Sequence, residues 1–220
     1  MSDLRFGRIF NKAYKSPYRY PSTFKKYEKK KMDDIIKNQP FCREFYVQEI
    51  KTILVNCEHI YMNIEHLLQN TNIEESQHII FHIIQNLIRE TGMLSKFFWP
   101  VREKELHCLR AKHLKKYFNI SDDSPLNNKQ IRNAIEHFDE RLDLFLSKPN
   151  NSMGFTFPYL IGEESALETE KQTNIYKFFD PNKLVIKIFD ERLELAPILE
   201  ELRNLSVICF NDRKRMTQNL

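Results

Sequence analysis

The segment "FCREFYVQEIKTILVNCEHIYMNIEHLLQN" (residues 41–70) has apolar residues at helical spacing along its whole length. Apolar side chains that recur every three or four residues lie on one face of an α-helix, so the segment predicts one long helix with a buried face. The residues of that predicted face are Phe45, Ile50, Ile53, Leu54, Cys57, Ile60, Ile64, Leu67 and Leu68. This helix indicates a mainly α-helical protein.

A second helix is predicted directly after the first. Thr71 or Asn72 can cap its N-terminus, and two glutamates occupy its first turn, where carboxylates are favourable. Gly92 and the "FFWP" of residues 97–100 mark its end or a kink. A third helical segment is predicted for residues 102–118, and a loop for "NISDDSPLNN" (residues 119–128).

The segment "NNKQIRNAIEHFDERLDLFL" (residues 127–146) predicts a fourth amphipathic helix. Its apolar stripe is wide enough for a core helix of a bundle. The stripe consists of Ile131, Ala134, Ile135, Phe138, Leu142, Phe145 and Leu146. Its "FDERLDL" (residues 138–144) is echoed by "FDERLEL" (residues 189–195), which we interpret as a coincidence because the flanking sequences differ.

The pattern changes after residue 147, where a long loop is expected. Two β-rich runs, residues 175–179 and 184–189, flank a turn "DPNK" and predict a β-hairpin. A closing helix is predicted for about residues 196–209. The fold class is therefore mainly α: an antiparallel helical bundle with a C-terminal β-hairpin and closing helix.

Three regions are expected within a single globular domain overall. Residues 1–40 form a basic, aromatic N-terminal arm, residues 41–148 form the helical bundle, and residues 149–220 form the loop, hairpin and helix packed on it. Residues 1–31 hold ten Lys or Arg against two acidic residues, a balance of +8, so the remainder is −4 in a chain of net charge +4.

Basic residues interleaved with aromatic ones in the arm suit single-stranded nucleic acid, because cations neutralise phosphates and rings stack on bases. The same aromatic residues could instead pack on the bundle or on a partner subunit. The residues expected to bind nucleic acid or a partner are Arg5, Arg8, Lys12, Lys15, Arg19, Lys25 and Lys26.

Composition argues against several other classes. The four glycines are too few for Gly-rich phosphate loops, and neither GxGxxG nor GxxxxGK[ST] occurs. The four cysteines are dispersed, which is typical of reduced thiols. We find no apolar run that could serve as a signal peptide and none approaching the ~18 residues of a membrane span. We therefore expect a cytoplasmic protein without membrane contact.

Polar side chains gather on the face of residues 127–146 opposite the apolar stripe. They are Arg132, Asn133, Glu136, His137 and Glu140. Asn133 and His137 are four residues apart, so their side chains can meet, and Glu136 can pair with Arg132 in the same way.

The string "RNAIEH" resembles the Arg-x4-His motif of HEPN-superfamily proteins, and the longer "RNAIEHFDERLD" resembles segments of uncharacterised bacterial proteins of similar size. The resemblance covers roughly residues 41–146, while the hairpin and closing helix depart from a minimal HEPN bundle. It implies a metal-independent endoribonuclease without cofactor, commonly a homodimer with RNA as substrate. It also implies a toxin or phage-defence setting, with a possible antitoxin-like protein partner.

The resemblance implies catalytic roles for Arg132, Asn133 and His137. Histidine exchanges protons near neutral pH, and the arginine fork matches phosphate oxygens. Asn133 could orient the imidazole or the phosphate, while Glu136 and Glu140 support the polar face. The alternatives are solvated surface pairs, whose acidic neighbours would repel phosphate, and a non-catalytic HEPN-like module that binds RNA, nucleotide or a protein partner.

Two other pairs of histidines lie in the predicted long helices. His78 and His82 have a spacing that can bind a metal, but their apolar neighbours favour the core or a subunit interface, so no metal site is expected. His59 and His66 lie in the apolar-rich first helix and are interpreted as residues of the interior or of a helix seam.

Overall fold

The structure is a computed structural model that describes residues 40–102, 104–128, 133, 135–148, 155–165, 167 and 173–217. Residues 1–39 of the predicted arm lie outside the described residues. The seven basic residues predicted to bind nucleic acid or a partner also lie outside the described residues: Arg5, Arg8, Lys12, Lys15, Arg19, Lys25 and Lys26.

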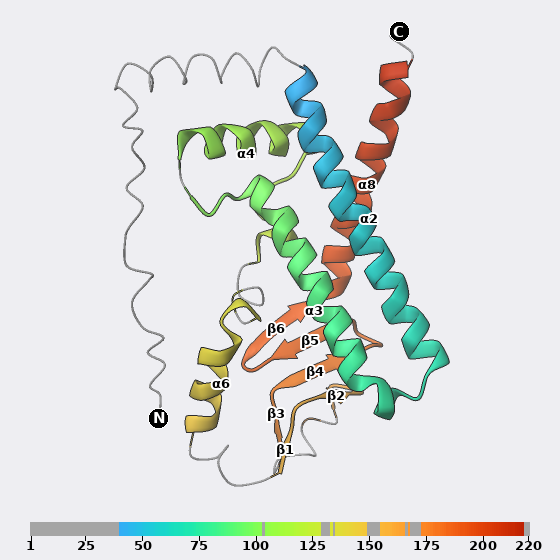
Figure 1. The fold of residues 1–220 in the computed structure, drawn as a ribbon, viewed down its shortest axis with the longest axis vertical. Coiled ribbons are helices and arrows are strands. Elements are labelled where there is room, and N and C mark those ends of the chain that lie inside the picture. The colour runs from blue at the N-terminus through green and yellow to red at the C-terminus, as the bar shows by residue number, and fades with distance from the viewer. Residues whose placement is uncertain are drawn as a thin grey trace, which may run out of the picture.

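Two long helices form a hairpin along one side of the protein (Figure 1). Helix α2 spans Pro40–Asn70 and α3 spans Ile73–Phe98, as their apolar periodicity predicts. The side chain of Asn72 accepts a hydrogen bond from the backbone N–H of Glu74 at 3.1 Å, so the predicted cap of α3 is confirmed. Because each helix buries one apolar face against the other, the hairpin supplies much of the core.

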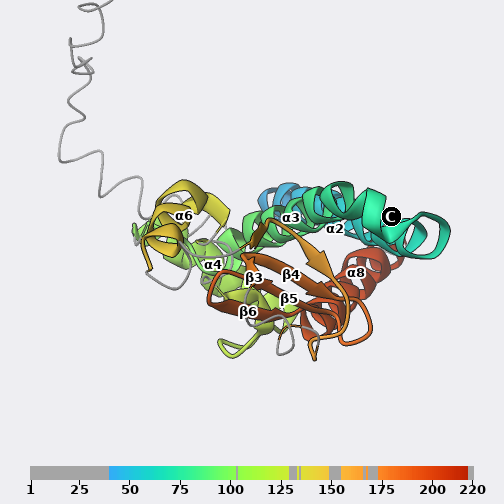
Figure 2. The same cartoon turned by 90° about the horizontal axis from the view of Figure 1, so that it is seen from below.

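A small four-stranded sheet packs against the helices. It consists of β2 (Leu160–Ile161), β4 (Lys177–Asp180), β5 (Val185–Ile188) and β6 (Glu191–Glu194), in the order β2-β4-β5-β6. The predicted hairpin is confirmed as the antiparallel pair β4–β5, while β6 and the parallel strand β2 extend it. Figure 2 shows α2 and α3 on one side of this sheet.

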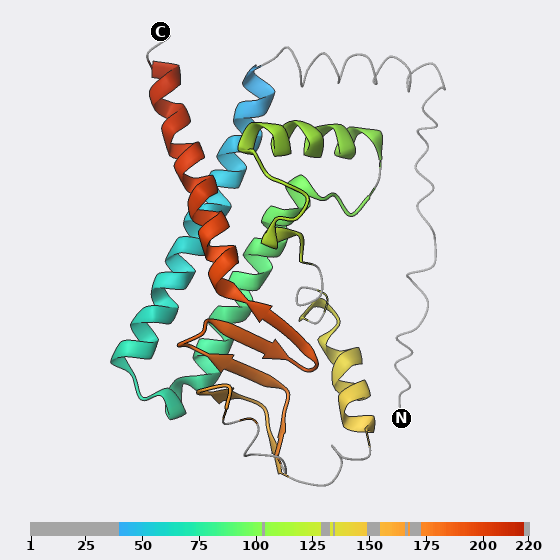
Figure 3. The ribbon, with the colours of Figure 1, turned by 180° about the vertical axis from the view of Figure 1, so that it is seen from behind.

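Two further elements complete the C-terminal part. Strands β1 (Phe155–Phe157) and β3 (Thr173–Ile175) form a separate parallel pair. Helix α8 (Leu195–Thr217) follows β6 directly and crosses α2 (Figure 3). It continues beyond its predicted end near residue 209. The fold is mainly helical with a small sheet near the C-terminus, and apolar residues of α2, α3, the sheet and α8 share one core.

The region between α3 and the sheet differs from the prediction. Helix α4 spans Glu105–Phe118, and a short 3-10 helix, η1, spans Pro125–Asn127. Residues 133, 135 and 136 are helical, as predicted, and helix α6 spans Phe138–Ser147. One continuous helix over residues 127–146 was nevertheless wrong, because residue 127 belongs to η1 and His137 forms a turn. His137, just before α6, has φ −114° and ψ 41°, which interrupts the helical path.

Helix α6 is not the core helix that its apolar stripe predicts. None of its residues is buried, and Leu146 is 44% exposed. The helix lies at the edge of the fold, where Phe138 and Phe145 contact the rings of Tyr176 and Phe189. An aromatic platform covers only part of the stripe, which explains why the rest stays exposed.

Three residues of α2 also differ from expectation. Phe45, assigned to the buried face, is 66% exposed. It lies near the start of α2, two residues before the buried Val47. His59 and His66 are exposed rather than interior, because the buried stripe of α2 runs along a different face of the helix.

The two "FDER" copies adopt different structures and contact each other. Residues 138–141 open helix α6, whereas residues 189–192 form a turn and the start of β6. The rings of Phe138 and Phe189 lie 5.2 Å apart, and Arg141 Nη1 lies 3.0 Å from Glu191 Oε1. Phe189 has a left-handed backbone, with φ 55°, which a helix does not permit. Tertiary context therefore decides the conformation of this sequence.

Asp180 holds the turn between β4 and β5 and gives a stability prediction. Its carboxylate is 1% exposed and accepts hydrogen bonds from the backbone N–H groups of Glu164, Asn182 and Lys183 at 2.9–3.0 Å. Burial alone would raise the pKa of Asp180, but the hydrogen bonds from Lys183, Glu164 and Asn182 outweigh it and lower the pKa. The folded state therefore favours the charged carboxylate.

Asp180→Asn is expected to lower the free energy of unfolding by about 2 kcal/mol at pH 7, because an amide presents only one acceptor oxygen. Because the pKa of Asp180 is lowered in the folded state, its charged carboxylate stabilises the protein above the ordinary pKa of 3.8. This stabilisation is lost as the pH falls through the lowered pKa. The difference between the proteins should therefore shrink in acid. Urea unfolding of both proteins at pH 7 and at an acidic pH below 3.8 measures this difference. The variant Asp190→Asn, at an exposed position, is the control. Equal stability of Asp180→Asn and wild type at pH 7 would contradict this role.

Candidate functional site

His137 lies at the junction between residues 133–136 and helix α6. Its backbone N–H donates to the carbonyl of Asn133 at 3.0 Å, and its own carbonyl accepts from the N–H of Arg141 at 3.1 Å. Both hydrogen bonds join residues four apart, as in an α-helix, although the backbone angles of His137 are not helical. Asn133 and His137 are thereby placed one turn apart, as the sequence predicts, and the His137 side chain is 59% exposed.

A cleft of about 370 Å³ opens beside His137. It lies between α6 and the turn that joins β5 to β6. The residues that line it are Asn133, His137, Glu140, Arg141, Leu144, Phe145, Lys148, Phe189 and Asp190. The structure thus brings together Asn133, His137 and Glu140 of the predicted polar face. Arg132 lies outside the described residues, so its pairing with Glu136 stays a prediction.

Ion pairs define the charge of this cleft. Arg141 contacts Glu191 at 3.0 Å, and Lys148 Nζ lies 2.8 Å from Asp190 Oδ2. Both cations come from α6 and its C-terminal end, and both carboxylates come from the β5–β6 turn and the first residue of β6. His137 Nδ1 lies 3.8 Å from Glu140 Oε2. The cleft therefore offers one imidazole beside two cations that are engaged with carboxylates.

Glu136 does not line this cleft. Its Oε1 lies 3.6 Å from Lys96 Nζ, near the end of α3. The turn at His137 separates Glu136 from the face that Glu140 and Arg141 share. Of the two glutamates assigned to the polar face, only Glu140 accompanies His137.

The sequence reasoning missed two cations of the cleft, Arg141 and Lys148. A signal for them exists, because they follow His137 by four and eleven residues, and these spacings place side chains on one helix face. The predicted polar face ended at Glu140, and Lys148 lies beyond the end of the predicted helix at residue 146.

A second cleft, of about 390 Å³, lies between α3 and the sheet. His78, His82 and Lys177 line it, together with Gln85, Tyr159, Ile79 and Phe81. His78 and His82 are exposed, so they do not lie in the core, and the alternative place at a subunit interface stays a prediction. Among the described residues, no group of three or more His, Cys, Asp or Glu side chains could hold a metal ion.

Lys177 was also missed by the sequence reasoning. Its one signal is a lysine within the otherwise apolar β-run "IYKFF" of residues 175–179. Its side chain is 8% exposed. Burial, and then the charge of Arg89, lowers the pKa of Lys177 below its ordinary value. A buried lysine with a shifted pKa in a cleft is a candidate functional group.

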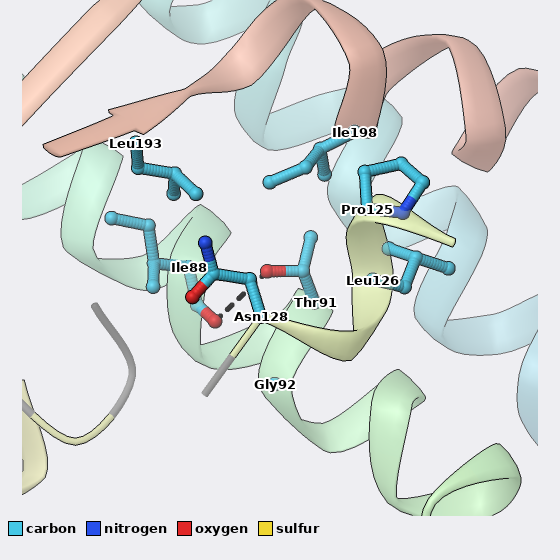
Figure 4. Close-up of a pocket in the computed structure, with 8 residues that line it drawn as sticks. All are labelled: Ile88, Thr91, Gly92, Pro125, Leu126, Asn128, Leu193 and Ile198. Carbon is cyan, nitrogen blue, oxygen red and sulfur yellow. Dashed lines mark hydrogen bonds between the residues drawn. The ribbon is translucent and has the colours of Figure 1, made fainter. Parts of the chain in front are cut away.

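A third cavity is a packing defect rather than a ligand site. It lies between α3, η1, β6 and α8 and measures about 20 Å³, which accommodates about one water molecule (Figure 4). Thr91, on its wall, donates to the carbonyl of Ile88 at 2.9 Å. Its remaining lining is largely apolar, so it offers little to bind a substrate.

In the part of the chain that the structure describes, every helix is too short or too polar to cross a membrane. No protein-family model, curated protein or solved structure matches the chain. The resemblance of residues 132–137 to the HEPN motif therefore stays a prediction.

Proposed function

We propose that the chain is an HEPN-like, metal-independent endoribonuclease that cleaves RNA at the cleft around His137. The observation that carries the proposal is an exposed imidazole in a cleft with Asn133 and two cations, Arg141 and Lys148. This combination provides a proton-exchanging group beside groups that attract phosphate.

RNA supplies its own nucleophile, the ribose 2′-hydroxyl. A base removes its proton, the oxygen attacks the adjacent phosphorus, and the bond to the 5′-oxygen breaks as that oxygen takes up a proton. The products are a 2′,3′-cyclic phosphate and a 5′-hydroxyl. His137 is the proton-transfer group, and Asn133 orients the imidazole or the phosphate.

Arg132 completes the machinery in this proposal. Its guanidinium would stabilise the charge that develops on the phosphorane, because the planar fork donates two hydrogen bonds to phosphate oxygens. In a homodimer, the His137 side chains of two protomers would divide the general-base and general-acid roles. The basic residues of the N-terminal arm would hold the RNA beyond the cleft.

The acidic side chains of the cleft do not prevent RNA binding. The Lys148–Asp190 pair is exposed, with side-chain accessibilities of 50% and 79%. An exposed ion pair contributes at most about 1 kcal/mol, so a phosphate can replace the carboxylate at little cost. Lys148 is therefore the cation we expect to contact the RNA backbone first. The Arg141–Glu191 pair is less exposed and serves to fix α6 against β6.

The biological setting is proposed from the HEPN resemblance. A ribonuclease of this kind would act in the cytoplasm as a toxin or phage-defence component, restrained by an antitoxin-like protein partner.

The test compares two oligonucleotides of the same sequence, one of RNA and one with every 2′-hydroxyl replaced by hydrogen. The wild-type protein is expected to cut the RNA and to leave the 2′-deoxy oligonucleotide intact, because the nucleophile is missing. Gel electrophoresis of end-labelled substrates gives the result. Equal cutting of both would contradict the proposal. Salt-sensitive RNA binding without cutting would favour the non-catalytic alternative.

A further inference from the structure

Lys177 is a buried cation without an acidic partner among the described residues. It lies on β4 two positions before Phe179, so both side chains point to the side of the strand that faces α3. Phe179 is completely buried in the core, and Lys177 is 8% exposed at the edge of that core. A charge removed from water without a counter-charge is costly. Such a residue therefore needs a reason beyond packing.

Three aromatic rings surround the Lys177 ammonium. Its Nζ lies 4.5 Å from the ring centroid of Phe138, 5.2 Å from that of Tyr159 and 5.9 Å from that of Tyr176. Ring faces attract a cation and offset part of the lost hydration. They carry no net charge, so they do not neutralise the ammonium. Beside these rings, Lys177 lines the cleft between α3 and the sheet.

The opposite wall of that cleft is a polar stripe on α3. His78, His82 and Gln85 are spaced by four and three residues, so they lie on one helix face. Each can donate a hydrogen bond, as can the hydroxyl of Tyr159. Among the described residues that line the cleft, none is an aspartate or a glutamate. Hydrogen-bond donors and a cation thus line one cleft, and its described lining residues include no carboxylate.

The apolar part of the lining limits what can enter. Phe81 and Tyr159 are stacked with their ring centroids 5.4 Å apart, and Ile79 completes this wall. The volume of about 390 Å³ lies at the lower end of the range for small-molecule pockets. The cleft therefore suits a compact ligand with one charged end and one apolar or planar end.

We propose that this cleft binds a small anion, a phosphate or carboxylate carried on an apolar or planar group. The anionic end pairs with Lys177 and accepts hydrogen bonds from His78, His82 and Gln85. The apolar end lies against the wall formed by Phe81 and Tyr159. Among the described residues, none lines both this cleft and the one at His137, so the proposal concerns a different site.

Isothermal titration of the full chain tests this site with four probes: phenyl phosphate, benzoate, inorganic phosphate and the neutral benzyl alcohol. We expect the first two to bind more tightly than the last two, because each of the latter lacks one of the two ends. The stronger of phenyl phosphate and benzoate identifies the anionic group. Failure of both to bind with a Kd below about 10 mM would overturn the proposal.

Three variants test whether the anion binds at Lys177. Lys177→Met keeps the aliphatic stem and should weaken binding of the preferred anion by at least about tenfold, whereas Lys183→Met, an exposed lysine on the same hairpin, should not change it. His82→Ala, at an exposed position that does not threaten folding, should also weaken binding. Unchanged affinity in both Lys177→Met and His82→Ala would overturn the assignment. Melting temperatures check that each variant is folded.

Discussion

Replacing His137 by alanine is expected to lower the rate of RNA cleavage by about 10²- to 10⁴-fold, the usual contribution of a general acid or base. The loss should not come from unfolding. The His137 side chain is exposed, its hydrogen bonds to Asn133 and Arg141 run through the backbone, and its contact with Glu140 is long, at 3.8 Å. The free energy of unfolding should therefore change by less than about 0.5 kcal/mol.

Single-turnover cleavage measures this effect, with denaturation of the same samples beside it. The matched control is His59→Ala, because His59 is an exposed histidine on α2 that lines neither the cleft at His137 nor the cleft at Lys177. It should cleave like the wild type. Equal rates for His137→Ala and wild type would remove His137 from the chemistry.

Replacing Phe179 by alanine is expected to lower the free energy of unfolding by about 3–5 kcal/mol, the range for a large aromatic side chain in a core. Phe179 is 0% exposed and projects from β4 into the core that α2, α3 and α8 share. Its pairing with Ile186 across β4 and β5 leaves little freedom for neighbours to fill the cavity. The sheet should thus be coupled to the helices through this residue.

Equilibrium unfolding in urea gives the value for Phe179→Ala. The control is Phe210→Ala on α8, whose ring is 47% exposed and lies 4.5 Å from the Lys51 ammonium. An exposed ring of this kind contributes about 1 kcal/mol or less. A loss at Phe179 no larger than at Phe210 would mean that the sheet contributes little to the common core.

Local pattern was sufficient to predict the long helices and one hairpin. Residues 41–70 and 73–98 repeat their apolar positions over many turns, so chance matches are averaged out. The β4–β5 hairpin was predictable because its turn "DPNK" lies directly between two β-rich runs. Strand β2 has two residues and pairs in parallel with β4, a segment distant in sequence. Such short, non-local pairing leaves no periodic signal.

Burial of α6 could not be predicted from its own sequence. Its apolar stripe is real, but the number of buried residues depends on what lies opposite, and here this is a small aromatic platform around Tyr176 and Phe189. The two "FDER" copies make the same point, because four identical residues start a helix in one place and form a turn and the start of a strand in the other.

The two candidate sites differ in how much the sequence reveals. Asn133 and His137 are neighbours through helical spacing, which sequence displays directly. Lys177 lines the same cleft as His78 and His82 only because the sheet packs beside α3, and no local pattern encodes that arrangement. Its unusual position within an apolar strand was visible, but its partners were not.

The most direct measurement of the proposed ribonuclease activity is the chemistry of the product ends. A defined RNA would be incubated with the wild-type protein in EDTA, and the fragments would be identified by mass spectrometry. We predict a 2′,3′-cyclic phosphate and a 5′-hydroxyl, because the ribose hydroxyl is the nucleophile and no metal takes part. Intact RNA, or ends with a 3′-hydroxyl and a 5′-phosphate, would contradict the account.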